Sequence, residues 1–84
     1  MRKKTERVYV KVSSDFDKTG YMQPRAIIMD DGRRYVIDQV SDYRPFSSDR
    51  DCYTIIIRGQ QRFLFFERSD PLFRSIVGRW YMEI

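Results

Sequence analysis

The sequence contains no histidine and only one cysteine, Cys52, in 84 residues. A single cysteine cannot form a disulfide framework within the chain, so the class of small disulfide-rich secreted domains is excluded. Zinc and haem sites of the usual kinds need histidine or several cysteines, and we therefore expect no metal and no cofactor. A serine or cysteine nucleophile would also lack its usual histidine base, so we expect a protein that is not an enzyme.

Long apolar runs are also missing from the chain. No stretch approaches the roughly 20 consecutive apolar residues that a membrane-spanning helix requires. The first residues are charged and lead into no apolar run, so they do not resemble a secretory signal. We therefore expect a cytoplasmic protein that does not enter a membrane. The length allows one core, which predicts a single domain over residues 1–84 with a flexible basic arm at residues 1–5.

Charge is unevenly distributed, although the formal net charge is only +4. Residues 1–14 carry five basic side chains against one acidic side chain, and residues 58–84 carry five arginines against three acidic side chains. The segment between them, 15–57, has six basic and eight acidic side chains. One interpretation is a one-sided basic surface that attracts nucleic acid, and the other is a set of ordinary surface ion pairs.

Alternation of apolar and polar residues with a period of two dominates the chain and predicts strands. Asp31-Gly32 is typical of a two-residue type I′ hairpin turn, because both residues tolerate positive φ. The polar residues 41–51 are predicted to form the longest loop, Gly59–Gln61 a tight turn, and Asp38-Gln39 a β-bulge. The predicted strands are 6–12, 22–29, 33–40, 52–58, 62–67 and 79–84.

A short helical element is predicted before the last strand. Asp70 and Pro71 are typical of the start of a helix and Gly78 of its end, which predicts one helical turn near 71–77. Such a turn before the final strand favours an all-β fold of the SH3-like kind, a small antiparallel and partly closed barrel. An OB-like barrel is the second alternative and a βββ–α sheet the third.

The strands 52–58 and 62–67 are apolar on both faces. After one face has filled the core, the other must be covered by something else. The helical turn is one candidate for this cover, and a partner protein or a second copy of the chain is the other, which would make the protein a homodimer. The predicted core consists of Val8, Val10, Val12, Ile28, Tyr35, Ile37, Tyr53, Ile55, Ile57, Phe63, Phe65, Phe73 and Trp80.

The segment 15–20 imitates the start of a calcium-binding EF-hand loop, with carboxylates at Asp15 and Asp17 and a glycine at Gly20. The twelfth position of such a loop should be a bidentate glutamate, and it is Ala26 here. The flanking residues are predicted strands, whereas an EF-hand needs helices. We therefore expect no metal site at this segment.

Arginines near the predicted turns form the candidate site for a nucleic acid. Arg58 and Arg62 would stand opposite each other across a three-residue turn, and a bound phosphate would relieve their repulsion. A two-residue turn would remove this arrangement, and a nearby carboxylate could neutralise either arginine. Aromatic rings stack on unpaired bases while arginines follow the backbone. The candidate residues are Arg33, Arg34, Tyr35, Arg58, Arg62 and Arg79, with Tyr9 as an alternative to Tyr35.

A resemblance that would cover nearly the whole chain is carried by Gly20 and by five runs: Pro24–Ile27, Asp31–Val40, Tyr53–Ile57, Phe63–Glu67 and Gly78–Tyr81. In these runs the chain resembles short uncharacterised proteins of Gram-positive anaerobic bacteria, which implies a small β-rich fold and no assigned activity. In Gly32–Ile37 and Gly78–Trp80 it is similar to a small domain associated with error-prone DNA polymerase accessory proteins, which implies a link to DNA metabolism.

These observations predict a small non-catalytic binding module that is associated with nucleic acid, with single-stranded nucleic acid as the partner. The alternative is a protein-interaction or self-associating β domain that uses the apolar outer face of strands 52–58 and 62–67. The two hypotheses place the binding surface differently, on arginines in the first case and on apolar side chains in the second.

Overall fold

The computed structural model describes residues 6–68 and 78–83. The basic arm at residues 1–5 and the helical turn expected near 71–77 lie outside these described residues. Every regular element of the described part is a β-strand, which confirms the predicted all-β class. The strands are β1 (Arg7–Phe16), β2 (Met22–Ile28), β3 (Arg34–Val36), β4 (Gln39–Ser47), β5 (Arg50–Ile57), β6 (Gln60–Arg68) and β7 (Gly78–Glu83).

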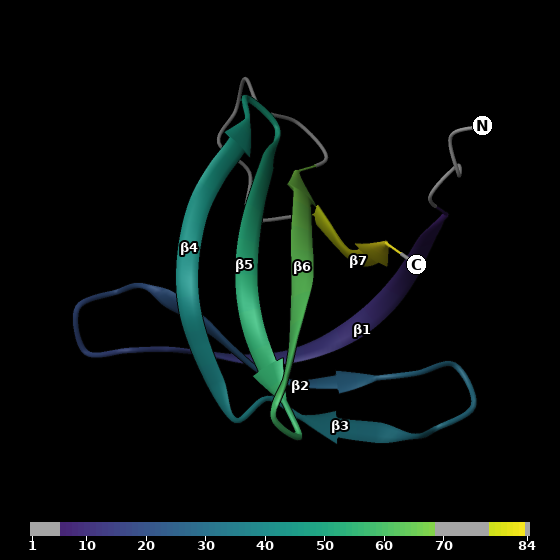
Figure 1. Cartoon of the computed structure of the whole chain (residues 1–84). Coiled ribbons are helices and arrows are strands. Elements are labelled where there is room, and N and C mark those ends of the chain that lie inside the picture. The colour runs from purple at the N-terminus through teal and green to yellow at the C-terminus, as the bar shows by residue number, and fades with distance from the viewer. Residues whose placement is uncertain (1–5, 69–77, 84) are drawn as a thin grey trace.

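All seven strands belong to one antiparallel sheet with the order β3-β2-β1-β7-β6-β5-β4. The long strand β1 holds the two halves together, because its residues Arg7–Val10 pair with β7 and its residues Lys11–Phe16 pair with β2. Figure 1 shows β1 passing behind the curved strands β4, β5 and β6 to reach the β2–β3 side.

The sheet curls because a link of only two residues, Ile37-Asp38, connects β3 at one edge of the sheet to β4 at the other edge. Both β3 and β4 run in the same direction, and Ile37-Asp38 lies between them. The Ile37 N–H donates to the Arg25 carbonyl of β2 at 2.9 Å, and the Asp38 N–H donates to the Ile56 carbonyl of β5 at 2.8 Å. The result is the small, partly closed barrel that the sequence predicted. Its order is a meander in the described residues, without the Greek-key crossing of an OB-fold.

The interior of the barrel is apolar and aromatic. Its buried cluster contains Ile27, Ile37, Tyr53, Ile55, Leu64, Phe66 and Trp80. Two of the predicted core positions are therefore wrong: Ile27 is buried in place of Ile28, and Phe63 is 50% exposed. The predicted Phe73 lies outside the described residues.

Strand β6 has the opposite phase from the predicted one. The run 63–66 is apolar at every position, so alternation cannot tell which face is inside. In the structure Leu64 and Phe66 point into the barrel, while Phe65 lies outside and stacks on Tyr81 with ring centroids 4.9 Å apart. The stacked pair is buried on the outer face of the sheet, at 7% and 0% exposure respectively.

The prediction of a long loop at 41–51 is wrong. Strand β4 extends to Ser47, and only two residues separate it from Arg50 in β5. Irregularities at Val40/Asp42 and Pro45/Ser47 shift the register, so the polar sequence shows no simple alternation. The bulge expected at Asp38-Gln39 is thus found a few residues later.

The β2–β3 hairpin differs in detail from the predicted two-residue turn. The Met29 carbonyl accepts from the Gly32 N–H at 2.9 Å, and the Met29 N–H donates to the Arg33 carbonyl at 2.8 Å, which leaves a three-residue turn over 30–32. In this turn only Gly32 has positive φ, at 90°. The carboxylate of Asp31 instead accepts from the Arg33 N–H at 3.0 Å, which fixes the turn with Asp31 in an ordinary conformation.

Candidate functional site

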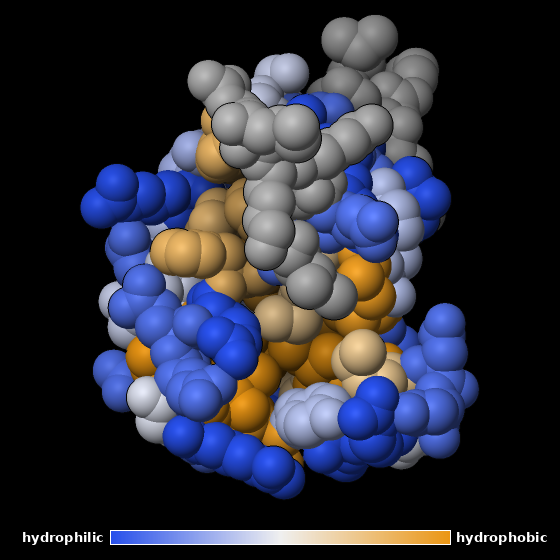
Figure 2. Space-filling view, turned by 45° about the vertical axis from the view of Figure 1, so that its right-hand side comes forward, coloured by the Kyte–Doolittle hydropathy of each residue, from blue (hydrophilic) through white to orange (hydrophobic). Residues whose placement is uncertain are grey.

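The barrel has a cavity at each end of its interior. Alternate residues of β6 line both of them, with Arg62 at one end and Phe66 and Arg68 at the other. Figure 2 shows apolar side chains open to the surface on one face of the molecule, bordered by hydrophilic ones. We call the two spaces the arginine cavity, of about 700 Å³, and the aromatic cavity, of about 740 Å³.

The arginine cavity has an apolar floor and a polar rim. Val8, Ile27 and Met82 are among the side chains of the floor. The rim is formed by one aromatic residue of β3, by the β5–β6 turn with the start of β6, and by the end of β7. Its members are Tyr35, Arg58, Gln60, Arg62 and Glu83.

The β5–β6 turn positions Arg58 on this rim. Ile57 pairs with Gln60, so the turn consists of Arg58 and Gly59 alone, with φ values of 50° and 76°. Two consecutive residues with positive φ are the signature of a type I′ turn. The Arg58 N–H donates to the Asp38 carboxylate at 2.9 Å, which ties the turn to the β3–β4 link.

The predicted opposition of Arg58 and Arg62 across the ladder is therefore wrong. Arg62 pairs with Ile55, and Arg58 lies in the turn itself. The prediction failed because it placed the turn at Gly59–Gln61 and left Arg58 in the strand, since an arginine with positive φ is rare. Both arginines nevertheless line the same cavity.

Tyr35 and Arg58 contact each other across the cavity rim. The Arg58 guanidinium carbon lies 5.7 Å from the centroid of the Tyr35 ring, which is within the range of a cation–π interaction. Tyr35 also packs against the buried cluster, so its ring is held from below. Tyr35 and Arg58, which are distant in sequence, thus place an aromatic ring and a cation side by side at the opening of the arginine cavity.

The guanidinium groups of Arg58 and Arg62 differ from those of most other described arginines because they form no ion pair with a described carboxylate. Seven described arginines have a carboxylate oxygen within 4.0 Å: Arg7, Arg25, Arg33, Arg44, Arg50, Arg68 and Arg79. Within residues 6–68 and 78–83, no carboxylate oxygen lies this close to the guanidinium group of Arg34, Arg58 or Arg62. The Arg62 guanidinium instead donates to the side-chain oxygen of Gln60 at 2.7 Å.

The remaining predicted site residues do not line the arginine cavity. Arg33 pairs with Asp31 at 2.6 Å, and Arg34 neighbours Tyr35 on β3 but is exposed on the other face. Arg79 lies on the outer face of the sheet, where it pairs with Glu67 and stacks on the ring of Tyr9 at 4.2 Å. The structure thus brings together Tyr35, Arg58 and Arg62 and leaves the other three apart.

Comparisons with protein-family models, with curated proteins and with solved structures find no match for this chain. Among the described residues, no group of three or more acidic or cysteine side chains is placed to hold a metal ion. That part of the chain also has no helix of the length and apolar character needed to cross a membrane. Its function must therefore be inferred from the geometry of its own residues.

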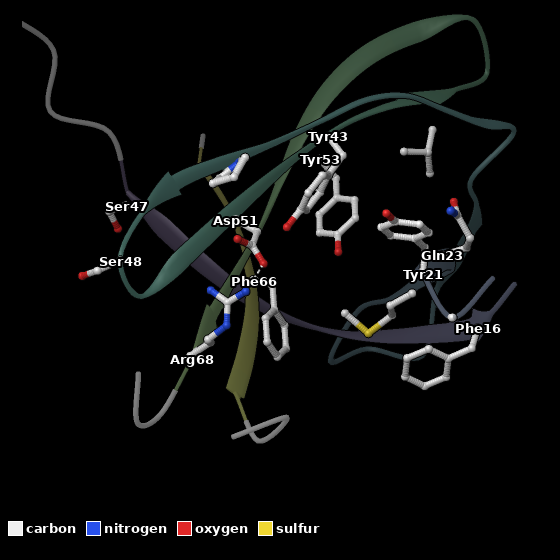
Figure 3. A pocket seen from close by; sticks show the side chains of 14 residues that line it. Phe16, Tyr21, Gln23, Tyr43, Ser47, Ser48, Asp51, Tyr53, Phe66 and Arg68 are labelled. Atoms are coloured by element: carbon white, nitrogen blue, oxygen red, sulfur yellow. Dashed lines mark hydrogen bonds and ion pairs between the residues drawn. The ribbon is translucent and has the colours of Figure 1, made fainter. Parts of the chain in front are cut away.

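No pattern in the sequence indicated the aromatic cavity. Its walls come from the β1–β2 hairpin on one side and from β4 and β5 on the other, and Figure 3 shows the rings of Tyr43 and Tyr53 side by side within it. Their centroids are 4.9 Å apart. The two tyrosines are directly paired across β4 and β5, a relation that assigning 41–51 to a loop had hidden.

A buried ion pair lies at one side of the aromatic cavity. Asp51 is 6% exposed, and its carboxylate accepts a hydrogen bond from the guanidinium of Arg68, drawn as a dashed line in Figure 3. Burial raises the pKa of Tyr53 to about 12, and burial followed by the nearby Asp51 charge raises the pKa of Tyr43. Both phenols therefore remain neutral hydrogen-bonding groups at physiological pH.

Proposed function

We propose that this protein is a non-catalytic binding module for single-stranded nucleic acid, and that the arginine cavity is its contact. The observation that carries the proposal is the convergence of Tyr35, Arg58 and Arg62 on one opening of the barrel. Neither guanidinium group has a carboxylate oxygen within 4.0 Å among the described residues, so both can bind a phosphate without breaking an ion pair. The acidic side chain of Glu83 on the same rim keeps the attraction modest.

The chemistry of single strands suits this arrangement. An unstacked base can lie on the ring of Tyr35 above the apolar floor, while the guanidinium groups of Arg58 and Arg62 contact the flanking phosphates. Stacking on Tyr35 and contacts to phosphates are available to every base, so we expect weak and sequence-tolerant binding. The basic arm at residues 1–5 would add to it through long-range attraction.

The test is a titration of fluorescently labelled oligo-dT and oligo-U by anisotropy, at low and at physiological salt. Neutralising about two phosphates would make log affinity fall by about 1.4 per decade of salt, at 0.7 for each phosphate. The decisive variant is Arg58→Asn/Arg62→Gln, because asparagine followed by Gly59 is the preferred type I′ pair and preserves the turn. We expect this variant to lose most of the binding and most of the salt dependence.

A matched control removes the same charge elsewhere. Arg25→Gln/Arg44→Gln also lowers the net charge by two, but these arginines pair with Asp15 and Asp42 on the surface and do not line the cavity. Equal loss of binding in both double variants would mean that only net charge matters and would refute a site at the arginine cavity. Absence of binding at low salt would refute the function itself.

Self-association is the second candidate function. On the outer face of the sheet, Phe63 is 50% exposed and Phe46 is 61% exposed, and the ring of Phe46 packs edge-on against Phe65. Sedimentation velocity of the wild type and of Phe46→Ser/Phe63→Ser tests it. A dimer that the double variant abolishes would support this function, and a wild-type monomer at high micromolar concentration would remove it.

A further inference from the structure

We infer that the aromatic cavity is a second binding site, which takes a purine base and prefers guanine. This inference is independent of the arginine cavity, because the two sites share no lining residue. At about 740 Å³ the space lies within the usual range of small-molecule sites. Its ligand can be identified by the chemistry of its walls.

The walls favour a flat ring. Five aromatic side chains line the cavity: Phe16, Tyr21, Tyr43, Tyr53 and Phe66. Phe16 and Tyr21 are 68% and 67% exposed at the tip of the β1–β2 hairpin, an unfavourable arrangement for two large rings in water. In Figure 3 these two rings lie on the opposite side of the space from Tyr43 and Tyr53, so a planar ligand between them would have aromatic rings on both sides.

The polar groups exclude the simpler ligands. A plain hydrocarbon that displaced water would give no hydrogen bonds to the phenol hydroxyls or to the donors and acceptors of Asp51 and Arg68 that their mutual ion pair does not use. Among the described residues that line the cavity, Arg68 is the only cation, and a free phosphate or carboxylate would find it already neutralised, while a free cation would meet that same guanidinium. The ligand must therefore be neutral in its recognised part and must carry both hydrogen-bond donors and acceptors.

An added peptide strand is also disfavoured. The cavity lies beside the edge strand β4, which would have to supply the backbone hydrogen bonds. Pro45 removes one donor from that edge, and the irregularities at Val40/Asp42 and Pro45/Ser47 interrupt its register. Proline and bulges of this kind are the devices by which sheets prevent pairing at their edges.

Guanine matches the remaining pattern. Its O6 and N7 atoms accept a pair of hydrogen bonds from an arginine, and its N1–H and amino group can donate to a carboxylate. Asp51 and Arg68 offer this acceptor and this donor side by side, and the Gln23 amide lies on the other side of the cavity. Adenine presents a donor where guanine has O6, so Arg68 would discriminate against it.

The test is calorimetric titration of the wild-type chain with GMP, AMP, UMP and ribose 5-phosphate. We expect GMP to bind about tenfold more tightly than AMP, the lower part of the range for a bidentate arginine contact. Ribose 5-phosphate is expected to give no signal. Binding of ribose 5-phosphate as strong as that of GMP, or no heat from any nucleotide at millimolar concentration, would overturn the proposal.

Variants locate the ligand without endangering the fold. Tyr21→Ala removes an exposed wall and should weaken GMP binding about tenfold with little change in melting temperature, since one base stack contributes on the order of 1–3 kcal/mol. Phe63→Ala, which removes an exposed ring from the outer face, is the matched control and should leave GMP binding unchanged. If Tyr21→Ala binds normally and Arg58→Asn/Arg62→Gln does not, the ligand lies in the arginine cavity and the inference is wrong.

A further arm distinguishes a free nucleotide from a base of a strand. A short oligonucleotide with one guanine is compared with the same strand carrying an abasic position there. If the oligonucleotide binds only when its guanine is present, and binds Tyr21→Ala less tightly than the wild type, the base can come from a strand. If the oligonucleotide with guanine does not displace bound GMP, the site takes the free nucleotide. Either result supports a guanine site.

Discussion

Replacing Arg68 by methionine should destabilise the fold far more than replacing its partner Asp51 by asparagine. Methionine keeps much of the apolar stem of the side chain but leaves the Asp51 carboxylate, 6% exposed, without a cation. Removing one partner of a buried pair costs about 3–5 kcal/mol of unfolding free energy. Because 27% of the Arg68 side chain is exposed, water reaches the pair, and we expect about 2–3 kcal/mol.

Asp51→Asn should cost less, about 1 kcal/mol, because the guanidinium left behind can turn toward solvent. In the double variant Asp51→Asn/Arg68→Met, the loss of unfolding free energy should be smaller than the sum of the two single losses by at least about 1 kcal/mol. For a chain of this size, a loss of 2–3 kcal/mol corresponds to a melting temperature lower by about 10–20 °C.

Urea unfolding followed by tryptophan fluorescence measures all three variants. Trp80 is the only tryptophan, and its ring lies 5.4 Å from that of Tyr53 and 4.9 Å from that of Phe66. Equal losses in the two single variants, together with strict additivity in the double variant, would refute the reasoning.

Three further results are expected. Gly78→Ala should destabilise by about 1–3 kcal/mol in urea unfolding, because the added methyl would lie 2.7 Å from Phe66 and closer still to the backbone carbonyl of Glu67. Arg58→Asn should raise the unfolding free energy by about 0.5–1 kcal/mol by relieving positive φ, and a loss would show that the arginine side chain supports the turn. Since the pKa of Tyr53 is raised from 10.0 to about 12, the folded state holds the phenolic proton more tightly than the unfolded state. Stability should therefore be full below pH 10 and fall toward pH 12, and Tyr53→Phe should flatten that slope in alkaline urea titrations.

The fold class could be predicted from the sequence because strands leave a local signal. Period-two alternation in residues 6–12 and 52–58 needs no knowledge of distant partners, and the structure has β1 and β5 there. The same signal fails where both faces are apolar, as at 63–66, and where irregular register disrupts alternation, as in β4. In those segments the inward face is decided by partners in other strands, which composition does not reveal.

The candidate site was predicted in part for a similar reason. Tyr35, Arg58 and Arg62 were identified by residue type, and they meet because β3 and the β5–β6 turn reach the same end of the barrel. Arg33 and Arg79 were chosen on the same grounds, but each has a carboxylate partner that only the fold brings near. The aromatic cavity was missed because its walls come from segments that only the register of β4 and β5 places together.

The shared pairing of β1 has a consequence for the kinetics of folding. Every other strand pair in the described sheet joins neighbours in sequence, whereas Val10 of β1 pairs with Trp80 of β7, 70 positions away. Closing so long a segment is entropically unfavourable, and contacts between distant positions slow folding. The hairpins should therefore form first and the β1–β7 contact last, so that this contact sets the folding rate. Its amides should also be among the first to exchange with deuterium, because the pairing that forms last opens most easily.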